Sequence, residues 1–293
     1  MNSKTSLESL PNELLLSTLS DLPTRDLLPL VAVNHRFCSA TLRILQQRLT
    51  RATSLPDHRV ILECYHPAAK LSTPTLNCDY LYTDSFFSDD DKTPQETEVD
   101  ITKTSLKQVY AHFKPVVRDE NRRPRARYPP SSTSNAANPP QNWQRETKPT
   151  HDLYLDEDEP FSQLCAVTSV SKVGPKPGLY LSHVNLDDSV IRIKRDWLAS
   201  QVGRRRGSAD TPSIEDDNIL WTDNTKEVGI RFRVTEIDVG APVLLNSEED
   251  PPVGYSLEFE ELLVRASTLL MTVEKSEKQE IATEGKAIVI ASI

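Results

Sequence analysis

Leucine dominates residues 9–37, which read SLPNELLLSTLSDLPTRDLLPLVAVNHRF, and thirteen leucines fall between Leu7 and Leu49. A segment of about 45 residues rarely supplies a stable core of its own, because too little of its surface becomes internal on folding. The surplus apolar side chains are therefore expected to form an exposed patch. Such patches usually mark a protein interface.

Helix start and stop signals predict three short helices in this segment. The first begins at Pro11, since proline suits the first helical position. Thr24 is expected to cap the second helix and Asn34 the third, because short polar side chains accept hydrogen bonds from free backbone N–H groups. Leu10, which precedes Pro11, cannot do this, and the missing cap costs about 1 kcal/mol. Burial on a partner is the interaction that would favour leucine there.

Three parts of the segment stand in a fixed order: Leu10-Pro11-Asn12-Glu13-Leu14, then Asp26-Leu27-Leu28, then Val33 followed four residues later by Phe37. In this order and spacing they resemble an F-box, and the resemblance covers about 45 of the 293 residues. In F-box proteins the Leu-Pro start and the apolar helix faces bind the Skp adaptor, which links them to a cullin–RING ubiquitin ligase. Phe37 stands where many members carry Trp. Pro29 is a second departure, since proline inside the second helix removes a backbone hydrogen bond and should kink or shorten that helix.

The resemblance implies a substrate-recognition subunit of an SCF-type (Skp–cullin–F-box) E3 ubiquitin ligase, located in the cytoplasm or nucleus and without an active site of its own. Its adaptor contacts are expected at ten apolar positions: Leu10, Pro11, Leu14, Leu15, Leu19, Leu27, Leu28, Val31, Val33 and Phe37. The other expected partner is a target protein that the sequence does not identify. Two alternatives stay open. One is a leucine-rich hairpin that packs against the rest of the chain, and the other is a non-catalytic binding module, lectin-like or scaffold, whose helices serve a different protein interface.

After residue 50 the pattern changes to short runs of β-branched and aromatic residues between turns. Nine runs are predicted to be strands: residues 60–65, 75–82, 164–170, 179–184, 189–194, 219–222, 228–234, 253–259 and 267–274. A helical turn is expected within Lys103–Phe113. Trp197–Val202 is expected to form a further strand that extends the one before it. The fold class predicted is multidomain α+β: a three-helix F-box at residues 1–50, then a mainly antiparallel β-sandwich or open barrel with long loops at residues 52–293.

Three polar segments are expected to be loops: residues 85–100, 119–159 and 203–217. Residues 119–159 are rich in proline and charge, which predicts a disordered insertion. The arginines within Arg122–Arg127 are either solvated linker charge or a nuclear localisation signal. Trp143 is either a docking anchor for a partner or a side chain folded back on the domain.

Composition excludes several classes of function. The net charge of −9 disfavours generic binding to nucleic acid, and charged residues interrupt the N-terminal leucines, so no membrane span is predicted. The four cysteines show no CxxC spacing, which indicates reduced thiols.

The sequence gives no sign of an active site. Phosphate-loop, serine-hydrolase and zinc-protease motifs are absent, so neither catalysis nor a cofactor is predicted. Cys64, His66 and Cys78 match no common zinc module, and no metal is predicted. Glu258 and Glu260 are expected on one face of a strand and Glu261 on the other, as solvated side chains; Asp187-Asp188 is interpreted in the same way.

Overall fold

The computed structural model describes residues 10–53, 57–70, 73–84, 106, 108–117, 148–156, 158–174, 179–207, 218–237, 252–282, 286 and 288–289, with the backbone alone for 203–207 and 288–289. Within these residues the α-helices are α1 (Asn12–Ser20), α2 (Thr24–Leu27), α3 (His35–Thr53), α5 (Arg195–Gly207) and α6 (Ala266–Ala282). Two 3₁₀ helices are η2 (Leu28–Ala32) and η3 (Pro67–Ala69). The strands are β1 (His58–Tyr65), β2 (Leu76–Thr83), β3 (Tyr110–Val116), β4 (Thr150–Leu155), β5 (Phe161–Val173), β6 (Leu179–Lys194), β7 (Ile219–Trp221), β8 (Val228–Ile237), β9 (Val253–Arg265) and β10 (Ile288–Val289).

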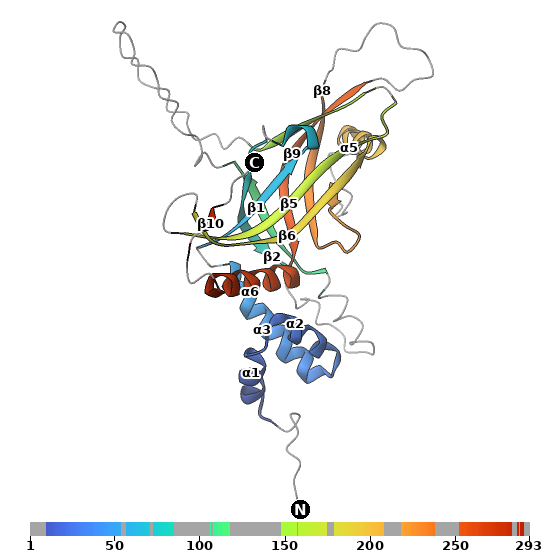
Figure 1. Ribbon diagram of the computed structural model, residues 1–293. Helices are drawn as coiled ribbons and strands as arrows, with labels where there is room; N and C mark the ends of the chain where they lie inside the picture. The colour runs from blue at the N-terminus through green and yellow to red at the C-terminus, as the bar shows by residue number, and fades with distance from the viewer. Residues whose placement is uncertain are drawn as a thin grey trace, which may run out of the picture.

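One curled antiparallel sheet makes up most of the described molecule (Figure 1). Its strands follow the order β10-β6-β5-β1-β2-β3-β9-β8-β7, and β4 pairs with β9 beside the end of β3. The helix α5 packs against β6 and β8, and α6 packs against β5, β6 and β9 at one end of the sheet. The α+β class with a β-rich domain is confirmed, and the described strands form an open half-barrel rather than two packed sheets.

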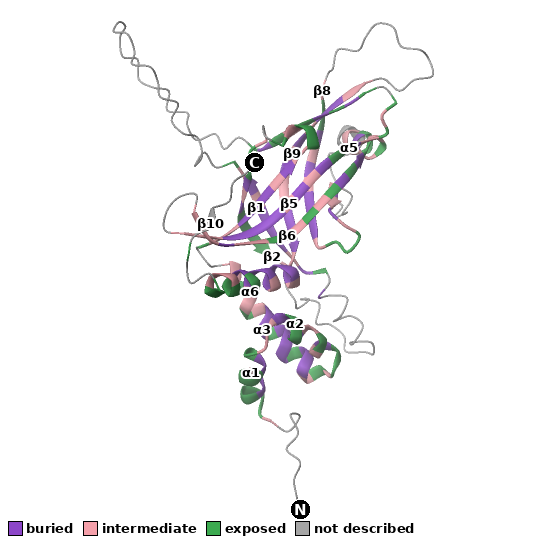
Figure 2. Cartoon of the chain, viewed as in Figure 1, coloured by how far each residue is buried: buried purple, intermediate pink, exposed green. Residues whose placement is uncertain are grey.

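The inner face of the sheet carries the hydrophobic core (Figure 2). In β8 the side chains of Ile230, Phe232 and Val234 are buried there, while Arg231 and Arg233 lie on the outer face, as the alternating sequence predicts. Phe232 packs against Phe259 of β9 with 4.9 Å between ring centroids. Leucines and a valine of α6 close one end of this core.

The N-terminal helices follow most of their sequence signals. Asn34 caps α3 as predicted, since its Oδ1 atom accepts a hydrogen bond of 2.9 Å from the backbone N–H of Phe37. The helix α1 begins one residue later than predicted, at Asn12, so that Pro11 and not Leu10 holds its N-cap position. The prediction that Thr24 caps α2 is wrong, because Pro23 holds the cap position and Thr24 is the first helical residue. Pro29 has the expected effect: α2 ends at Leu27 and the chain continues as the tighter helix η2.

Several predictions after residue 50 need correction. Residues 267–274 form part of α6, not a strand, and Trp197–Val202 lie in α5. The strand β4 lies inside the predicted disordered insertion, of which residues 119–147 fall outside the described residues together with Trp143 and Arg122–Arg127. Within Lys103–Phe113, where a helical turn is predicted, Leu106 and Gln108 are helical, and β3 begins at Tyr110.

Two predicted strands, residues 179–184 and 189–194, are a single strand, β6. Its pairing with β5 shifts at Leu186, which has no partner in the register. Of the predicted loops, residues 203–207 belong to the end of α5, and residues 85–100 and 208–217 lie outside the described residues.

Candidate functional site

Residues 10–53, here called the helical module, fold into α1, α2, η2 and α3. The ten predicted adaptor contacts divide by exposure. Five are buried inside the chain (Leu15, Leu19, Leu27, Val31, Phe37), two are half-buried (Leu10, Leu28) and three are exposed (Pro11, Leu14, Val33). A partner can therefore reach a smaller apolar surface than the sequence predicts, and the buried five belong to the hydrophobic core that the module shares with the rest of the chain.

Leu14 and Val33 are the large apolar side chains that the module leaves most exposed, at 55% and 58%. Near them, Arg36 of α3 fixes the start of α1. Its Nε donates to Oδ1 of Asn12 over 2.8 Å, and its Nη2 donates to the carbonyl oxygen of Leu10. The Leu10-Pro11 pair is therefore held against α3, although no signal in the sequence ties Arg36 to that role.

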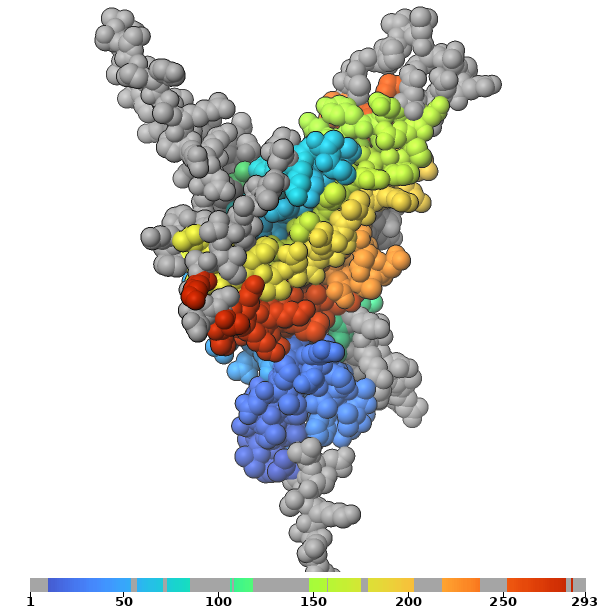
Figure 3. Space-filling model, viewed as in Figure 1, coloured from blue at the N-terminus to red at the C-terminus, as the bar shows by residue number. Residues whose placement is uncertain are grey.

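The helix α6 joins the helical module to the sheet (Figure 3). The carboxylate of Glu274 accepts two hydrogen bonds from the backbone N–H of Thr24, at 3.0 and 3.1 Å, and one of 2.5 Å from its hydroxyl. The backbone N–H groups at the start of a helix lack intrahelical partners and favour negative charge. Since Pro23 gives α2 no side-chain cap, Glu274 supplies one from far along the chain.

Arg48 of α3 completes this contact. Its Nη1 donates to Glu274 over 3.0 Å and to the hydroxyl of Thr24 over 3.1 Å. Its Nη2 donates to the carbonyl oxygens of Ser20 and Leu22, over 2.8 and 2.5 Å, which fixes the turn between α1 and α2. We call Glu274, Thr24 and Arg48 the latch. Sequence reasoning missed it, because its members are up to 250 residues apart.

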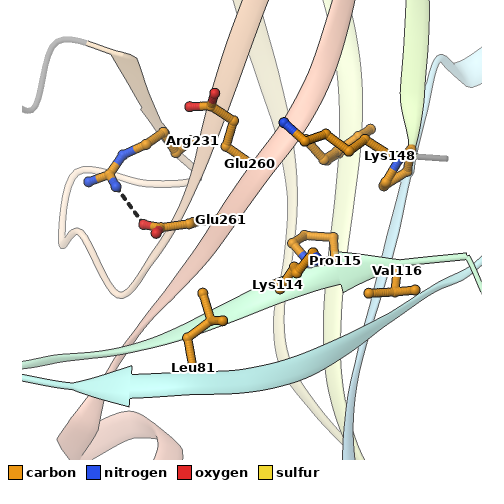
Figure 4. A pocket seen from close by; sticks show the side chains of 10 residues that line it. Leu81, Lys114, Pro115, Val116, Lys148, Arg231, Glu260 and Glu261 are labelled. Atoms are coloured by element: carbon orange, nitrogen blue, oxygen red, sulfur yellow. Dashed lines mark hydrogen bonds and ion pairs between the residues drawn. The ribbon is translucent and has the colours of Figure 1, made fainter. Parts of the chain in front are cut away.

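A cleft of about 230 Å³ lies on the outer face of the sheet (Figure 4). Here β3 pairs with β9 only from Tyr110 to Phe113, and β4 takes its place beside β9 from Thr150 onward. Pro115 contributes no N–H to a ladder, and proline is confined to such irregular places in sheets. The cleft is lined by Leu81, Lys114, Pro115, Val116, Lys148, Pro149, Arg231, Phe259, Glu260 and Glu261.

Three ion pairs surround the cleft. Glu261 accepts from Arg231 at 2.5 Å, Glu260 pairs with Arg233 at 2.6 Å, and Glu258 pairs with Lys148. The prediction that Glu261 faces away from the other two glutamates is wrong. The register between β8 and β9 shifts at this point and leaves Glu260 unpaired, and such a bulge turns the following side chain to the same face.

A buried imidazole continues the charged surface toward β2. His112 lies 3.5 Å from the carboxylate of Asp84 and 3.4 Å from that of Glu261, and the ring of Tyr82 stacks on it at 4.2 Å. Burial opposes ionisation of Asp84, but hydrogen bonds from His112 and from the backbone N–H of Tyr110 hold its pKa below the ordinary value. The network joins β2, β3 and β9 and presents an aromatic, charged face.

Three of the four cysteines, Cys38, Cys64 and Cys78, are buried. Cys64 and Cys78 are buried, and burial raises the pKa of both thiols. His66 accepts a hydrogen bond from the N–H of Ala68 at the start of η3. Within the described parts of the chain, no group of three or more His, Cys, Asp or Glu side chains is placed to hold a metal. Asp188 is exposed, and Asp187 accepts a hydrogen bond from Ser189.

Comparisons with protein-family models, with curated proteins and with solved structures found no match to this chain. Among the described helices, none is long and apolar enough to cross a membrane. Function is therefore inferred from the residues of the chain and their geometry.

Proposed function

We propose that this chain is a substrate receptor of an SCF-type ubiquitin ligase. The helical module binds the Skp adaptor, and the outer face of the sheet binds a target protein. The observation that carries the proposal is the exposure of Leu14 and Val33, two residues of the F-box pattern, on a module in which five of the other predicted contacts are buried. Where exposed apolar side chains form a contiguous patch, that patch usually marks an interface.

The size of the reachable surface limits the adaptor contact. Burying Leu14 and Val33 would contribute about 1.5–3 kcal/mol each before association costs. Pro11 and the half-buried Leu10 and Leu28 add to this surface, and Arg36 holds its Leu10-Pro11 edge in place. The five buried positions act by maintaining the shape of the module rather than by contact.

The target surface is the cleft with the adjoining face of β2. It combines the exposed Leu81 and Tyr82 with Lys114, Lys148 and Arg231. Tyrosine and arginine are enriched among the residues that dominate binding energy at interfaces. In this proposal the receptor has no chemistry of its own. It raises the concentration of a target near a ubiquitin-charged enzyme held elsewhere in the complex.

The latch supports a receptor in which the helical module binds the adaptor and the sheet binds the target. A receptor must hold its target at a fixed position relative to the adaptor, and a module joined to the sheet by flexible chain alone would not. Glu274 and Arg48 bond the helical module directly to a helix that packs under the sheet.

Binding of purified Skp adaptor, measured by biolayer interferometry, tests the proposal. Wild type is expected to bind with about micromolar or better affinity, and Leu14→Asp or Val33→Asp to weaken binding at least tenfold, since each places a charge in an apolar contact. Val190→Asp is the matched control, because Val190 is also 58% exposed but lies on β6. Failure of wild type to bind, or equal binding by all variants, would favour the alternative of a non-catalytic module with another partner.

A further inference from the structure

Two arginines of α3 hold the two ends of α1. At its start, Nη2 of Arg36 donates to the carbonyl oxygen of Leu10. At its end, Nη2 of Arg48 donates to the carbonyl oxygens of Ser20 and Leu22, over 2.8 and 2.5 Å. Because these acceptors belong to the backbone, the bonds fix the position of the chain itself rather than that of one side chain.

These bonds determine how α1 is turned on α3. The helix has nine residues, packs against α3, and buries the side chains of Leu15 and Leu19. Apolar contact is non-directional, so the two leucines hold α1 against α3 without fixing its orientation. A helix this short is also marginal by itself. The directional bonds at its two ends therefore decide where the exposed Leu14 points.

Arg48 is held from the side of the sheet as well. Its Nη1 donates to the carboxylate of Glu274 over 3.0 Å, and α6, which carries Glu274, lies between the helical module and the sheet (Figure 1). A guanidinium presents its N–H groups in a rigid planar fork. The bond to Glu274 on one nitrogen therefore orients the other nitrogen, which donates to the end of α1.

We propose that α6 controls the adaptor surface: Glu274 holds Arg48 in the orientation in which it clamps the end of α1, and so sets how Leu14 is presented. Arg48 and Glu274 are positioning residues, since neither is among the ten predicted adaptor contacts. The inference rests on the proposed function for the identity of the partner. The coupling between α6 and α1 is a property of the chain alone.

Loss of this coupling has a defined effect on binding. If α1 is correctly turned in only a fraction of the molecules, the apparent affinity for a partner falls by that fraction. The stabilisation lost with about one hydrogen bond corresponds to a roughly three- to tenfold change in that population. The same change should appear in the opening of α1 when no partner is present.

Hydrogen exchange of the intact chain without a partner, followed by mass spectrometry, tests the coupling. The readout is the exchange rate of the α1 amides from Leu15 to Ser20, because the hydrogen bonds of Glu274 are to Thr24 and Arg48. Glu274→Gln should raise these rates roughly three- to tenfold, and Arg48→Met at least as much.

Three control variants separate this effect from others. Glu277→Gln and Arg43→Met change exposed charges on α6 and α3 and should leave the α1 rates unchanged. Gly229→Ala, which crowds Trp221 of the sheet, should also leave them unchanged, because α1 opens locally. An equal rise in Gly229→Ala would show that α1 exchanges by general loss of stability.

Affinity for the purified Skp adaptor is the second readout. Glu274→Gln and Arg48→Met should each weaken binding roughly three- to tenfold. Glu274→Gln should have no further effect in the Arg48→Met background, because it acts through Arg48. It should multiply the effect of Arg36→Met, since Arg36 lies about 18 Å away along α3 and acts on the other end of α1.

Two further results would overturn the proposal. One is unchanged exchange of the α1 amides in both Glu274→Gln and Arg48→Met. The other is unchanged adaptor affinity in a variant whose α1 exchange has risen. Failure of wild type to bind the adaptor would refute the proposed function instead, and exchange would still decide the coupling. Glu274→Gln keeps the shape of the side chain, so the test does not require Arg48→Met to fold.

Discussion

Replacement of Glu274 by glutamine or alanine should lower the free energy of unfolding, and alanine should lower it more because it keeps no acceptor oxygen for Thr24 and Arg48. The carboxylate accepts from Thr24 and Arg48 over 2.5–3.1 Å and is about one-quarter exposed. Hydrogen bonds to a charged group contribute about 1.5–3 kcal/mol, and a charge at a helix N-terminus about 0.3–1 kcal/mol, before solvent screening reduces both. Glutamine keeps one acceptor oxygen, so Glu274→Gln should cost about 1 kcal/mol. Glu274→Ala leaves the buried N–H of Thr24 unpaired and should cost about 2–3 kcal/mol.

Urea unfolding followed by circular dichroism measures these losses as shifts of the midpoint. Glu277→Gln is the matched control, since Glu277 is exposed on the same helix. A double-mutant cycle of Glu274→Gln with Arg48→Met isolates their interaction, for which we expect about 1 kcal/mol of coupling. The reasoning is refuted if Glu274→Gln costs no more than Glu277→Gln, or if the two latch substitutions are additive.

Three further changes have defined outcomes. Gly229→Ala should lower stability by about 1–3 kcal/mol in urea unfolding, because the new Cβ would lie 2.8 Å from the ring of Trp221; unchanged stability would mean that β7 yields freely. Asp84→Asn should remove pH-dependent stability: the depressed pKa of Asp84 stabilises the fold above the unfolded value of about 3.9, and this is lost as pH falls through the folded value. Urea midpoints of wild type and Asp84→Asn should therefore converge only below about pH 4, and parallel profiles would contradict the assignment. Iodoacetamide at pH 8 should modify the half-exposed Cys165 before the buried Cys64. Mass spectrometry of the native protein measures the order of modification, and earlier modification of Cys64 would contradict the prediction.

The helical module was predictable because its signals are local. Pro11 and Asn34 influence where a helix starts within a few residues of themselves. Pro29 interrupts its helix because proline has this effect inside any helix. What could not be predicted is which leucines of the module are buried in the folded chain and which are exposed. Burial of Leu15 and exposure of Leu14 depend on how α1 packs against α3. Because the two residues are adjacent leucines, the sequence does not distinguish the buried one from the exposed one.

The sheet was predicted well where strands alternate and poorly where context decides. Residues 267–274 contain threonine and valine, which favour strands, but the chain continues into helix-forming residues, and Leu269, Leu270 and Val273 are buried together at helical spacing. In contrast, β4 carried a readable signal, because Leu153 and Leu155 alternate with polar residues. The proline-rich composition around it concealed that pattern.

The cleft and the latch lay beyond sequence reasoning for another reason. Both depend on pairs that the register brings together, such as Arg231 with Glu261 and Thr24 with Glu274. A one-residue bulge changed the face of Glu261, and periodicity alone gives no warning of a bulge.

The latch also imposes an order on biosynthesis. Thr24 emerges from the ribosome 250 residues before Glu274, a delay of about 12–50 s at 5–20 residues per second. Throughout that interval α2 has no carboxylate at its first turn, and Arg48 has no acidic partner on α6. A nascent chain that stalls before α6 would expose an unfinished module. The first helices are therefore secured by α6 only after strands β1 to β9 have been translated.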